Sequence, residues 1–319
     1  CPSLDSFRFN DGITVENIGE QAFYGCTALA TFTLPDNSVT LGNYCFLDCT
    51  SLQTVVFDTN TVLAEVLGSV FQNTALANFD VTASGNDNGL LLSADGKTVV
   101  FAATAKDFTN LVLSYENIGA GAFCGTNVVT LTFTSAVNIG DYAFANCKDL
   151  TTINFADAEG TVVGKHSFNY AENLTAITNL DKVKKVGDYA FANTGLRNVV
   201  LGADSTFGEG AFFLSDLEEV TIGANSTFGL GAFQDCKYLT TVNMPEGGNV
   251  HFGQGCFARD ALLSVIDLSK VDDTIEDETF YGCTSLVTAV LTNVKYIGNY
   301  ACRLQRIASP ANTRCRQYR

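Results

Sequence analysis

The chain has 319 residues, of which 46% are hydrophobic and only 16% charged, and its formal net charge is −16. This composition excludes an intrinsically disordered chain, which would carry more charge and fewer apolar residues. No apolar run approaches the roughly 18 residues that a transmembrane helix needs, so no membrane-spanning segment is expected. A chain this acidic repels phosphate backbones, so we expect no nucleic-acid partner.

A phenylalanine followed three residues later by a small residue and then by leucine recurs along the chain. The clearest copy, residues 18–35, reads IGEQAFYGCTALATFTLP and has its anchor aromatic at Phe23. Periods of this kind indicate a solenoid, whose units bury apolar side chains only against neighbouring units. The anchors lie 21 to 25 residues apart, except for a gap of 52 after the third, and are Phe23, Phe46, Phe71, Phe123, Phe144, Phe168, Phe191, Phe212, Phe233, Phe257 and Phe280.

Each repeat predicts a corner, an inward-pointing aromatic ring and a short strand, in that order. Glycine usually stands four residues before the anchor, as Gly19 does, and suits a corner where a side chain would clash or φ must be positive. The segment around the anchor is expected to form a one-turn helix or 3₁₀ turn. The alternation of residues 29–34 then predicts a strand with one face inward. Stacked repeats would align these strands about 4.8 Å apart in a parallel sheet.

The long gap between anchors and the end of the chain depart from this pattern. Residues 88–101 read NGLLLSADGKTVVF, which predicts two short strands around an Asp-Gly turn and hence a hairpin insertion near residues 83–110. We expect one solenoid domain over residues 1–302. Residues 303–319 do not follow the phase of the repeats and form a basic tail. Their sequence is compatible with a cap, a linker, a basic contact segment or a wrongly translated end. The arginines of this tail, with no acidic residue among them, are Arg303, Arg306, Arg314, Arg316 and Arg319.

The repeated pattern I-G-x-x-A-F-x-x-C-x-x-L-x-x-V-x-L-P resembles the BspA-like leucine-rich repeat over residues 1 to about 302. The resemblance implies a right-handed leucine-rich-repeat horseshoe or β-solenoid of about a dozen repeats, with a parallel sheet on one face and short helical or 3₁₀ turns on the other. Similar hairpins interrupt arrays of this family. Its members are surface proteins of anaerobic bacteria and of protists. This implies an extracellular or cell-surface location and protein or glycoprotein partners on a host or neighbouring cell.

The residues that could carry chemistry mostly occupy structural positions of the repeat. Cysteines at the small position interchange with Ser, Thr and Ala in other repeats, which favours a packed thiol ladder over a metal or redox site. No C-x-x-C pair indicates zinc. The two histidines, His166 and His251, lie far apart along the array, which argues against a catalytic triad or a histidine metal site. We therefore expect no enzymatic activity, no cofactor and no metal.

Two covalent modifications are candidates. A disulfide between Cys302 and Cys315 would close an irregular C-terminal loop, and it is favoured over a bond between Cys26 and Cys49 in adjacent repeats. The sequon at Asn225 makes this residue a candidate glycosylation site if a eukaryote secretes the protein.

The outward strand positions, eight and ten residues after each anchor, form the candidate ligand surface. Threonine is a good strand former, so a structural ladder explains much of this face. These outward positions carry no Tyr, Trp or Arg, which predicts that each single contact with a ligand is weak. Binding strength would then come from a large contact area or from multivalency, as in adhesion. The alternative is a structural subunit that assembles end to end into filaments or a surface layer. The candidate face consists of Thr31, Thr33, Thr54, Thr130, Thr132, Thr152, Asn154, Thr178, Asn198, Thr221, Thr241, Asn243 and Thr288.

Overall fold

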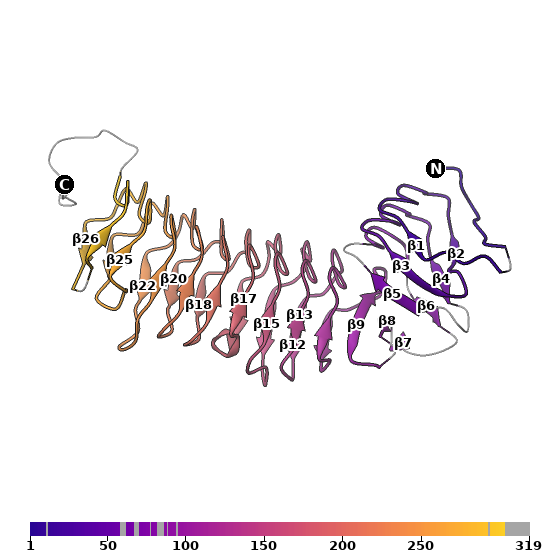
Figure 1. Cartoon of the computed structure of the whole chain (residues 1–319), viewed down its shortest axis with the longest axis horizontal. Coiled ribbons are helices and arrows are strands. Elements are labelled where there is room, and N and C mark those ends of the chain that lie inside the picture. Colours follow the sequence, from indigo (N-terminus) through magenta and orange to yellow (C-terminus); the bar gives the residue numbers. More distant parts are fainter. Residues whose placement is uncertain are drawn as a thin grey trace.

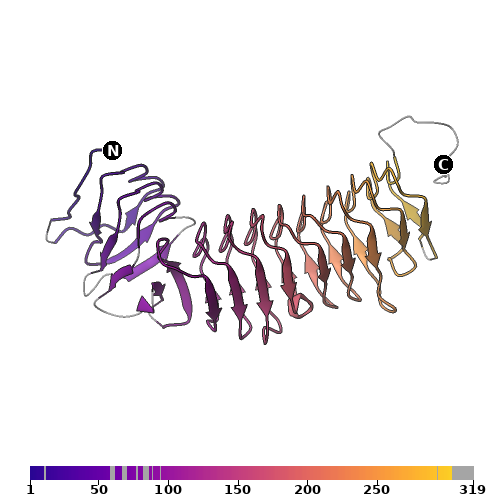
Figure 2. The same ribbon diagram turned by 180° about the vertical axis from the view of Figure 1, so that it is seen from behind.

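The computed structural model describes residues 1–303, except 11, 58–61, 67–69, 77, 82–85, 88, 94 and 293. The chain is a parallel β-solenoid of about 12 turns, which confirms the fold class expected from the repeats. Figure 1 and Figure 2 show an elongated array in which the N-terminal repeats are turned relative to the longer array that follows them.

Each full repeat contributes two strands. One is the longer strand expected from the Leu-x-x-Val-x-Leu pattern, because its alternate residues point into the core. These strands are β2 (Thr31–Thr33), β4 (Thr54–Phe57), β6 (Asn78–Val81), β10 (Asn110–Leu113), β12 (Thr130–Phe133), β14 (Thr152–Phe155), β16 (Ala176–Thr178), β18 (Asn198–Val200), β20 (Glu219–Thr221), β22 (Thr241–Asn243), β24 (Val265–Asp267) and β26 (Thr288–Val290).

The second strand of each repeat is usually only two residues long and, in most repeats, ends just before the corner glycine. These strands are β1 (Asn17–Ile18), β3 (Ser38–Leu41), β5 (Val62–Val66), β11 (Asn117–Ile118), β13 (Asn138–Ile139), β15 (Val162–Val163), β17 (Lys185–Val186), β19 (Thr206–Phe207), β21 (Thr227–Phe228), β23 (His251–Phe252), β25 (Thr274–Ile275) and β27 (Tyr296–Ile297).

Both sets of strands pair in parallel, so the solenoid has two sheet faces where the sequence predicted one. The longer strands form four sheets, β2–β4–β6, β10–β12–β14–β16, β18–β20–β22 and β24–β26. The shorter strands from β11 to β23 belong to one ten-stranded sheet that also includes β9 (Thr98–Ala102), β8 (Leu90–Leu92) and β7 (Asn86–Asp87). The short strands escape a sequence analysis because two residues are too few to show an alternating pattern.

The segment around each anchor is not helical, which corrects the expected helical or 3₁₀ turn. In the described part of the chain the one helix is a 3₁₀ turn, η1 (Leu180–Lys182), which follows β16. The residues two before and two after an anchor adopt positive φ, as Tyr142 (58°) and Asn146 (57°) do around Phe144. Left-handed residues at this spacing prevent a right-handed helix from propagating. The anchor N–H instead bonds the next repeat, as from Phe144 to Ser167 O (2.7 Å).

The corner glycine is required by close contact and not by its backbone angle. A Cβ atom on Gly140 would lie 2.7 Å from the backbone nitrogen of Ala120 and 2.8 Å from the carbonyl oxygen of Ile118. Its φ is not in the left-handed region, whereas left-handed residues flank the anchor instead. Backbone approach between neighbouring repeats therefore selects glycine at this position.

The anchor rings stack along the solenoid and, except for the half-buried Phe23, are buried. Successive rings lie face to face from Phe23 to Phe71 and again from Phe123 to Phe280, for example Phe144 on Phe168 with centroids 5.3 Å apart and planes 6° apart. Offset stacking adds to the free energy gained from burying each ring, by about 0.5–1.5 kcal/mol per pair. This ladder holds neighbouring repeats together.

A hairpin divides the core in two. Strand β8 pairs antiparallel with β9, and β9 pairs in parallel with β11, so the hairpin starts the second array. Leu91 and Phe101 pack into the N-terminal core cluster, while Leu90 and Val99 pack into the C-terminal one. The ring of Phe101 meets that of Phe71 edge to face, with centroids 5.0 Å apart. The two faces of the hairpin thus seal two core clusters.

Candidate binding surface

The sheet β10–β12–β14–β16 carries the best-aligned part of the predicted ligand face. Thr130 pairs in register with Thr152, and Thr132 with Asn154, which in turn pairs with Thr178. The residues between them, such as Leu131 and Ile153, are buried. Because the repeats are in register, side chains of one kind form straight rows across the strands.

Hydrogen bonds across the strands order this sheet. The hydroxyl of Thr130 donates to Asn110 Oδ1 at 2.8 Å, and that of Thr178 donates to Asn154 Oδ1 at 2.9 Å. Asn154 Oδ1 also accepts a bond from Asn179 Nδ2 at 2.9 Å. The rows are therefore pre-ordered, which lowers the entropic cost of binding a ligand. Asn110 is not among the predicted face residues, because its strand lies in the long gap between anchors.

The other predicted face residues lie on three further sheets, so the structure does not bring all of them together. Thr31, Thr33 and Thr54 lie on β2 and β4, and Thr288 lies on β26. On the third sheet Thr221 aligns with Asn243, while Asn198 and Thr241 flank Glu219. Asn243 Nδ2 donates to Glu219 Oε1 at 2.6 Å. The candidate face is thus a series of patches, each local to a few repeats.

An aromatic row on the turn side of the solenoid was not expected. His166 stacks between Tyr142 and Tyr189, with centroids 4.8 and 5.3 Å away. Burial lowers the pKa of His166, whose Nδ1 lies 3.1 Å from Asn169 Nδ2. The hydroxyl of Tyr189 donates to Glu209 Oε1 at 2.6 Å, which, as the main cause, raises the pKa of this tyrosine to about 12. The sequence does contain a signal for this aromatic row, because Tyr or His recurs two residues before the anchor.

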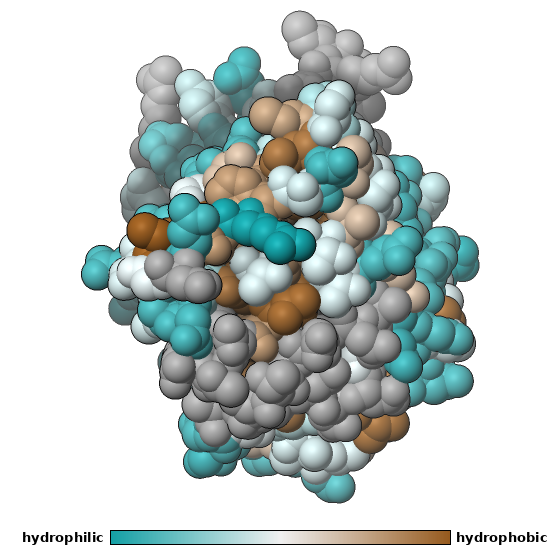
Figure 3. Space-filling view, turned by 90° about the vertical axis from the view of Figure 1, so that its right-hand side faces the viewer, coloured by the Kyte–Doolittle hydropathy of each residue, from teal (hydrophilic) through white to brown (hydrophobic). Residues whose placement is uncertain are grey.

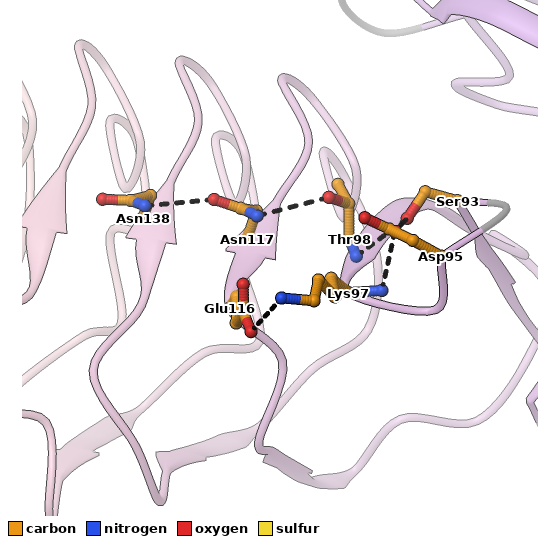
Figure 4. A network of polar contacts seen from close by, with 7 residues as sticks. All are labelled: Ser93, Asp95, Lys97, Thr98, Glu116, Asn117 and Asn138. Atoms are coloured by element: carbon orange, nitrogen blue, oxygen red, sulfur yellow. Dashed lines mark hydrogen bonds and ion pairs between the residues drawn. The ribbon is translucent and has the colours of Figure 1, made fainter.

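A polar network fastens the hairpin to the second array (Figure 4). Asn138 Nδ2 donates to Asn117 Oδ1 at 3.0 Å, and Asn117 Nδ2 donates to Thr98 Oγ1 at 3.4 Å. The turn is closed by Asp95 Oδ1, which accepts from the backbone N–H of Lys97 at 3.0 Å. Lys97 Nζ forms an ion pair with Glu116 at 2.8 Å. These contacts are structural, and most of them lie at the exposed surface.

The cysteine ladder is a packing element. Cys147 Sγ donates to the carbonyl oxygen of Phe123 at 3.1 Å, and burial raises the pKa of this thiol to about 12. A neutral buried thiol is a poor nucleophile and a poor metal ligand. Cys26 and Cys49 are free thiols. Cys302 lies half-buried in the last described turn. Its suggested partner Cys315 lies outside the described residues, so this disulfide stays a prediction.

Asn225, the candidate glycosylation site, is exposed, but its side chain already forms hydrogen bonds with the neighbouring repeats. Its Nδ2 donates to Asp204 Oδ1 at 3.0 Å, and its Oδ1 accepts from the backbone N–H of Asn249 at 3.2 Å. A glycan on the amide nitrogen would compete with the first of these bonds. Modification of this residue therefore stays a prediction.

Two features are absent from the described residues. In that part of the chain no group of three or more His, Cys, Asp or Glu side chains could hold a metal ion. The same residues include no helix with the length and apolar character that a bilayer crossing requires. His251 pairs with Asp272, Nδ1 to Oδ2 at 2.8 Å, and His166 belongs to the aromatic row, so the two histidines serve different contacts.

These repeats match a known repeat family. The model of the BspA type leucine rich repeat region matches residues 1–88, 98–218 and 205–314. A leucine-rich repeat protein from Bacteroides ovatus is 17% identical, with 91% of this chain and 80% of that chain covered and a TM-score of 0.49. The pneumococcal vaccine antigen PcpA is 16% identical, with 90% and 73% covered and a TM-score of 0.52.

A third solved structure, a leucine-rich cell surface protein from Faecalibacterium prausnitzii, is 17% identical, with 88% and 84% covered and a TM-score of 0.29. At 16% identity the likeness to PcpA concerns the fold alone. No curated protein matches the sequence significantly.

Proposed function

Because the chain belongs to the BspA-type leucine-rich repeat family, we propose that it is a non-enzymatic recognition or adhesion module that acts outside the cell or at its surface. Its ligands are proteins or glycans of a host or neighbouring cell. They bind along the longer strands, where the outward Thr and Asn side chains stand in register.

The in-register rows on β10–β16 are the observation that carries this proposal. They offer hydroxyl and amide groups at a regular repeat, and none of them is needed to fill the core. A flat face of small polar side chains makes weak single contacts. Such contacts add up when a ligand extends over several repeats or when many copies bind one surface, which is the requirement of adhesion.

Binding to a glycan array and to immobilised extracellular-matrix proteins tests the proposal. The variant changes Thr130 and Thr152 to Glu, because these two threonines pair in register on β12 and β14 and the change places charge and bulk on this sheet. The matched control changes Thr206 and Thr227 to Glu, because these threonines are also exposed but lie on the short strands β19 and β21. We expect the face variant to lose at least tenfold in apparent affinity and the control to bind as the wild type does.

Circular dichroism of both variants shows whether the fold is retained. Equal binding by the face variant and the control would contradict a role for the longer strands. Binding by neither the wild type nor the control to any probe would count against recognition of these two ligand classes.

The alternative, end-to-end assembly, would cover apolar side chains that are exposed at the first and last described repeats. Ile297 on β27 is 50% exposed, whereas the equivalent Ile275 on β25 is 3% exposed. The opposite end shows hydrophobic side chains amid hydrophilic ones (Figure 3), and Phe7 and Ile13 are exposed there. Stacking of one copy on another would bury these side chains. Concentration-dependent fibres under the electron microscope would support assembly, and a monodisperse monomer at high concentration would exclude it.

A further inference from the structure

Asp260 is a carboxylic acid sealed inside the solenoid without a hydrogen-bond partner. The exposed fraction of Asp260 is 0%, and neither of its carboxyl oxygens forms a hydrogen bond with another described group. It stands three residues after the anchor Phe257, at the small position of its repeat. A buried, unpartnered carboxylate is costly, so the group takes up a proton instead of remaining charged.

The repeats that carry Thr or Ser at this position show what a hydroxyl group does there. Thr126 and Thr194 donate their hydroxyls to the anchor carbonyl oxygens of their own repeats, at 2.8 and 2.9 Å. Ser215 does the same at 2.7 Å. A deprotonated carboxylate cannot replace these residues, because it has no proton to donate. At this position an aspartic acid can act as a donor only in its protonated form.

The groups around Asp260 offer little compensation for a negative charge. Cys236 and Cys283 occupy the same position in the repeats before and after, and Cys256 is the buried neighbour of the anchor; all three have pKa values raised by burial and then by Asp260. Asp235 and Arg259 are charged side chains that act on Asp260, and they pair with each other. Burial raises the pKa of Asp260 well above its ordinary value, and the nearby backbone N–H of Cys236 offsets only part of this.

We propose that Asp260 makes its part of the solenoid a proton-linked joint, which is closed while the carboxyl group is protonated and which opens locally, between the repeats anchored at Phe233 and Phe280, as the proton is released. In a solenoid each repeat is held only by its two neighbours, so a weakened repeat can open without the rest of the array. The joint is a conformational device of the fold and does not depend on which ligand the outer face binds.

The direction of the pH effect follows from linkage. The unfolded or opened chain binds fewer protons than the closed one between the ordinary pKa of an aspartic acid and its raised value in the closed state. Opening is therefore favoured as the pH rises through this window. One released proton changes the opening constant by at most about tenfold per pH unit.

Hydrogen exchange followed by mass spectrometry between pH 5 and pH 8 tests the joint, after correction for the intrinsic exchange rates. In the wild-type chain we expect protection of residues 236–283 to fall by up to tenfold per pH unit, while residues 123–147 keep theirs. The variant Asp260→Thr places the residue of the Phe123 and Phe191 repeats at this position. We expect it to remove the pH dependence and to raise protection of residues 236–283 at pH 8 by at least tenfold.

A second variant, Asp260→Asn, separates ionisation from packing. It keeps the shape and the unsatisfied polar atoms but cannot lose a proton, so its protection should be independent of pH even if it is low. The proposal is overturned if the wild type and Asp260→Asn show the same pH dependence in residues 236–283. It is equally overturned if the wild-type chain loses protection uniformly along its length.

Discussion

The rings of Phe168 and Phe191 stack face to face, with centroids 5.2 Å apart and planes 1° apart. Both side chains are fully buried. Changing Phe191 to Ala removes this contact and leaves a cavity between two repeats, so we expect a loss of about 3–5 kcal/mol in the free energy of unfolding. Chemical denaturation followed by circular dichroism measures it, with hydrogen exchange reporting whether the loss is confined to the adjoining repeats.

Phe213→Ala is the matched control for the ladder. This ring is half-buried on the turn side and meets Tyr189 only edge to face, with centroids 6.1 Å apart. Phe213→Ala should therefore lower the free energy of unfolding by clearly less than Phe191→Ala does. Equal losses for the two variants would show that the stacked anchors are not the main contact between repeats.

The corner glycines give a second prediction with an internal control. Gly140→Ala would push a Cβ atom to within 2.9 Å of the preceding repeat's backbone, which cannot move aside as a flexible side chain would. Gly19 stands at the same position of its repeat, but a Cβ atom there would meet no other atom within 4 Å, and its φ is not positive. We expect Gly140→Ala to destabilise by more than about 2 kcal/mol. Gly19→Ala should be neutral or slightly stabilising, by at most about 1 kcal/mol.

Thermal and urea unfolding of the two glycine variants provide the comparison. If both alanines destabilise equally, backbone approach is not what selects glycine at the corner.

Thiol chemistry offers a third prediction. Burial raises the pKa of Cys49 to about 11 and that of Cys147 to about 12. Only the thiolate reacts with alkylating reagents, so both side chains should resist iodoacetamide in the folded protein at pH 8. Cys1 is exposed and should react readily. Peptide mass spectrometry after timed labelling separates the sites, and urea should make Cys147 as reactive as Cys1. Rapid labelling of Cys147 in the native chain would contradict its role as a packed residue.

His166 predicts a pH effect opposite in sign to that of Asp260. Burial lowers its pKa in the folded state, so the unfolded chain binds the extra proton first as the pH falls. Its contribution to stability is present above the ordinary histidine pKa and is lost through the range below it. His166→Tyr removes this titration and keeps an aromatic ring, as at Tyr142 and Tyr189. Between pH 7 and pH 5 the wild type should lose more thermal stability than the variant. Parallel melting curves for the two proteins at both pH values would exclude this role.

Much of the fold could be predicted because the apolar residues that form the core recur at the same positions in each repeat. Residues such as Phe144, Leu150 and Ile153 recur at fixed spacing, and the structure buries all three. The outward rows followed from the same alternation, since Thr152 must face away from the core when Ile153 faces into it. Their use as a binding face, the domain boundary after residue 302 and glycosylation at Asn225 stay predictions.

The sequence by itself determined the period, the anchors and the strand phase, because burial of apolar side chains at regular intervals is a local property of the chain. Only the tertiary structure decided the features that depend on contact between repeats: the left-handed residues around Phe144, the second sheet of short strands, the backbone contact that requires Gly140, and the hairpin that divides the core. The contacts between repeats join residues about twenty positions apart, and those within the hairpin join residues about ten positions apart. Asp260 shows the difference most clearly, since its position was readable in the sequence but its unpartnered burial was not.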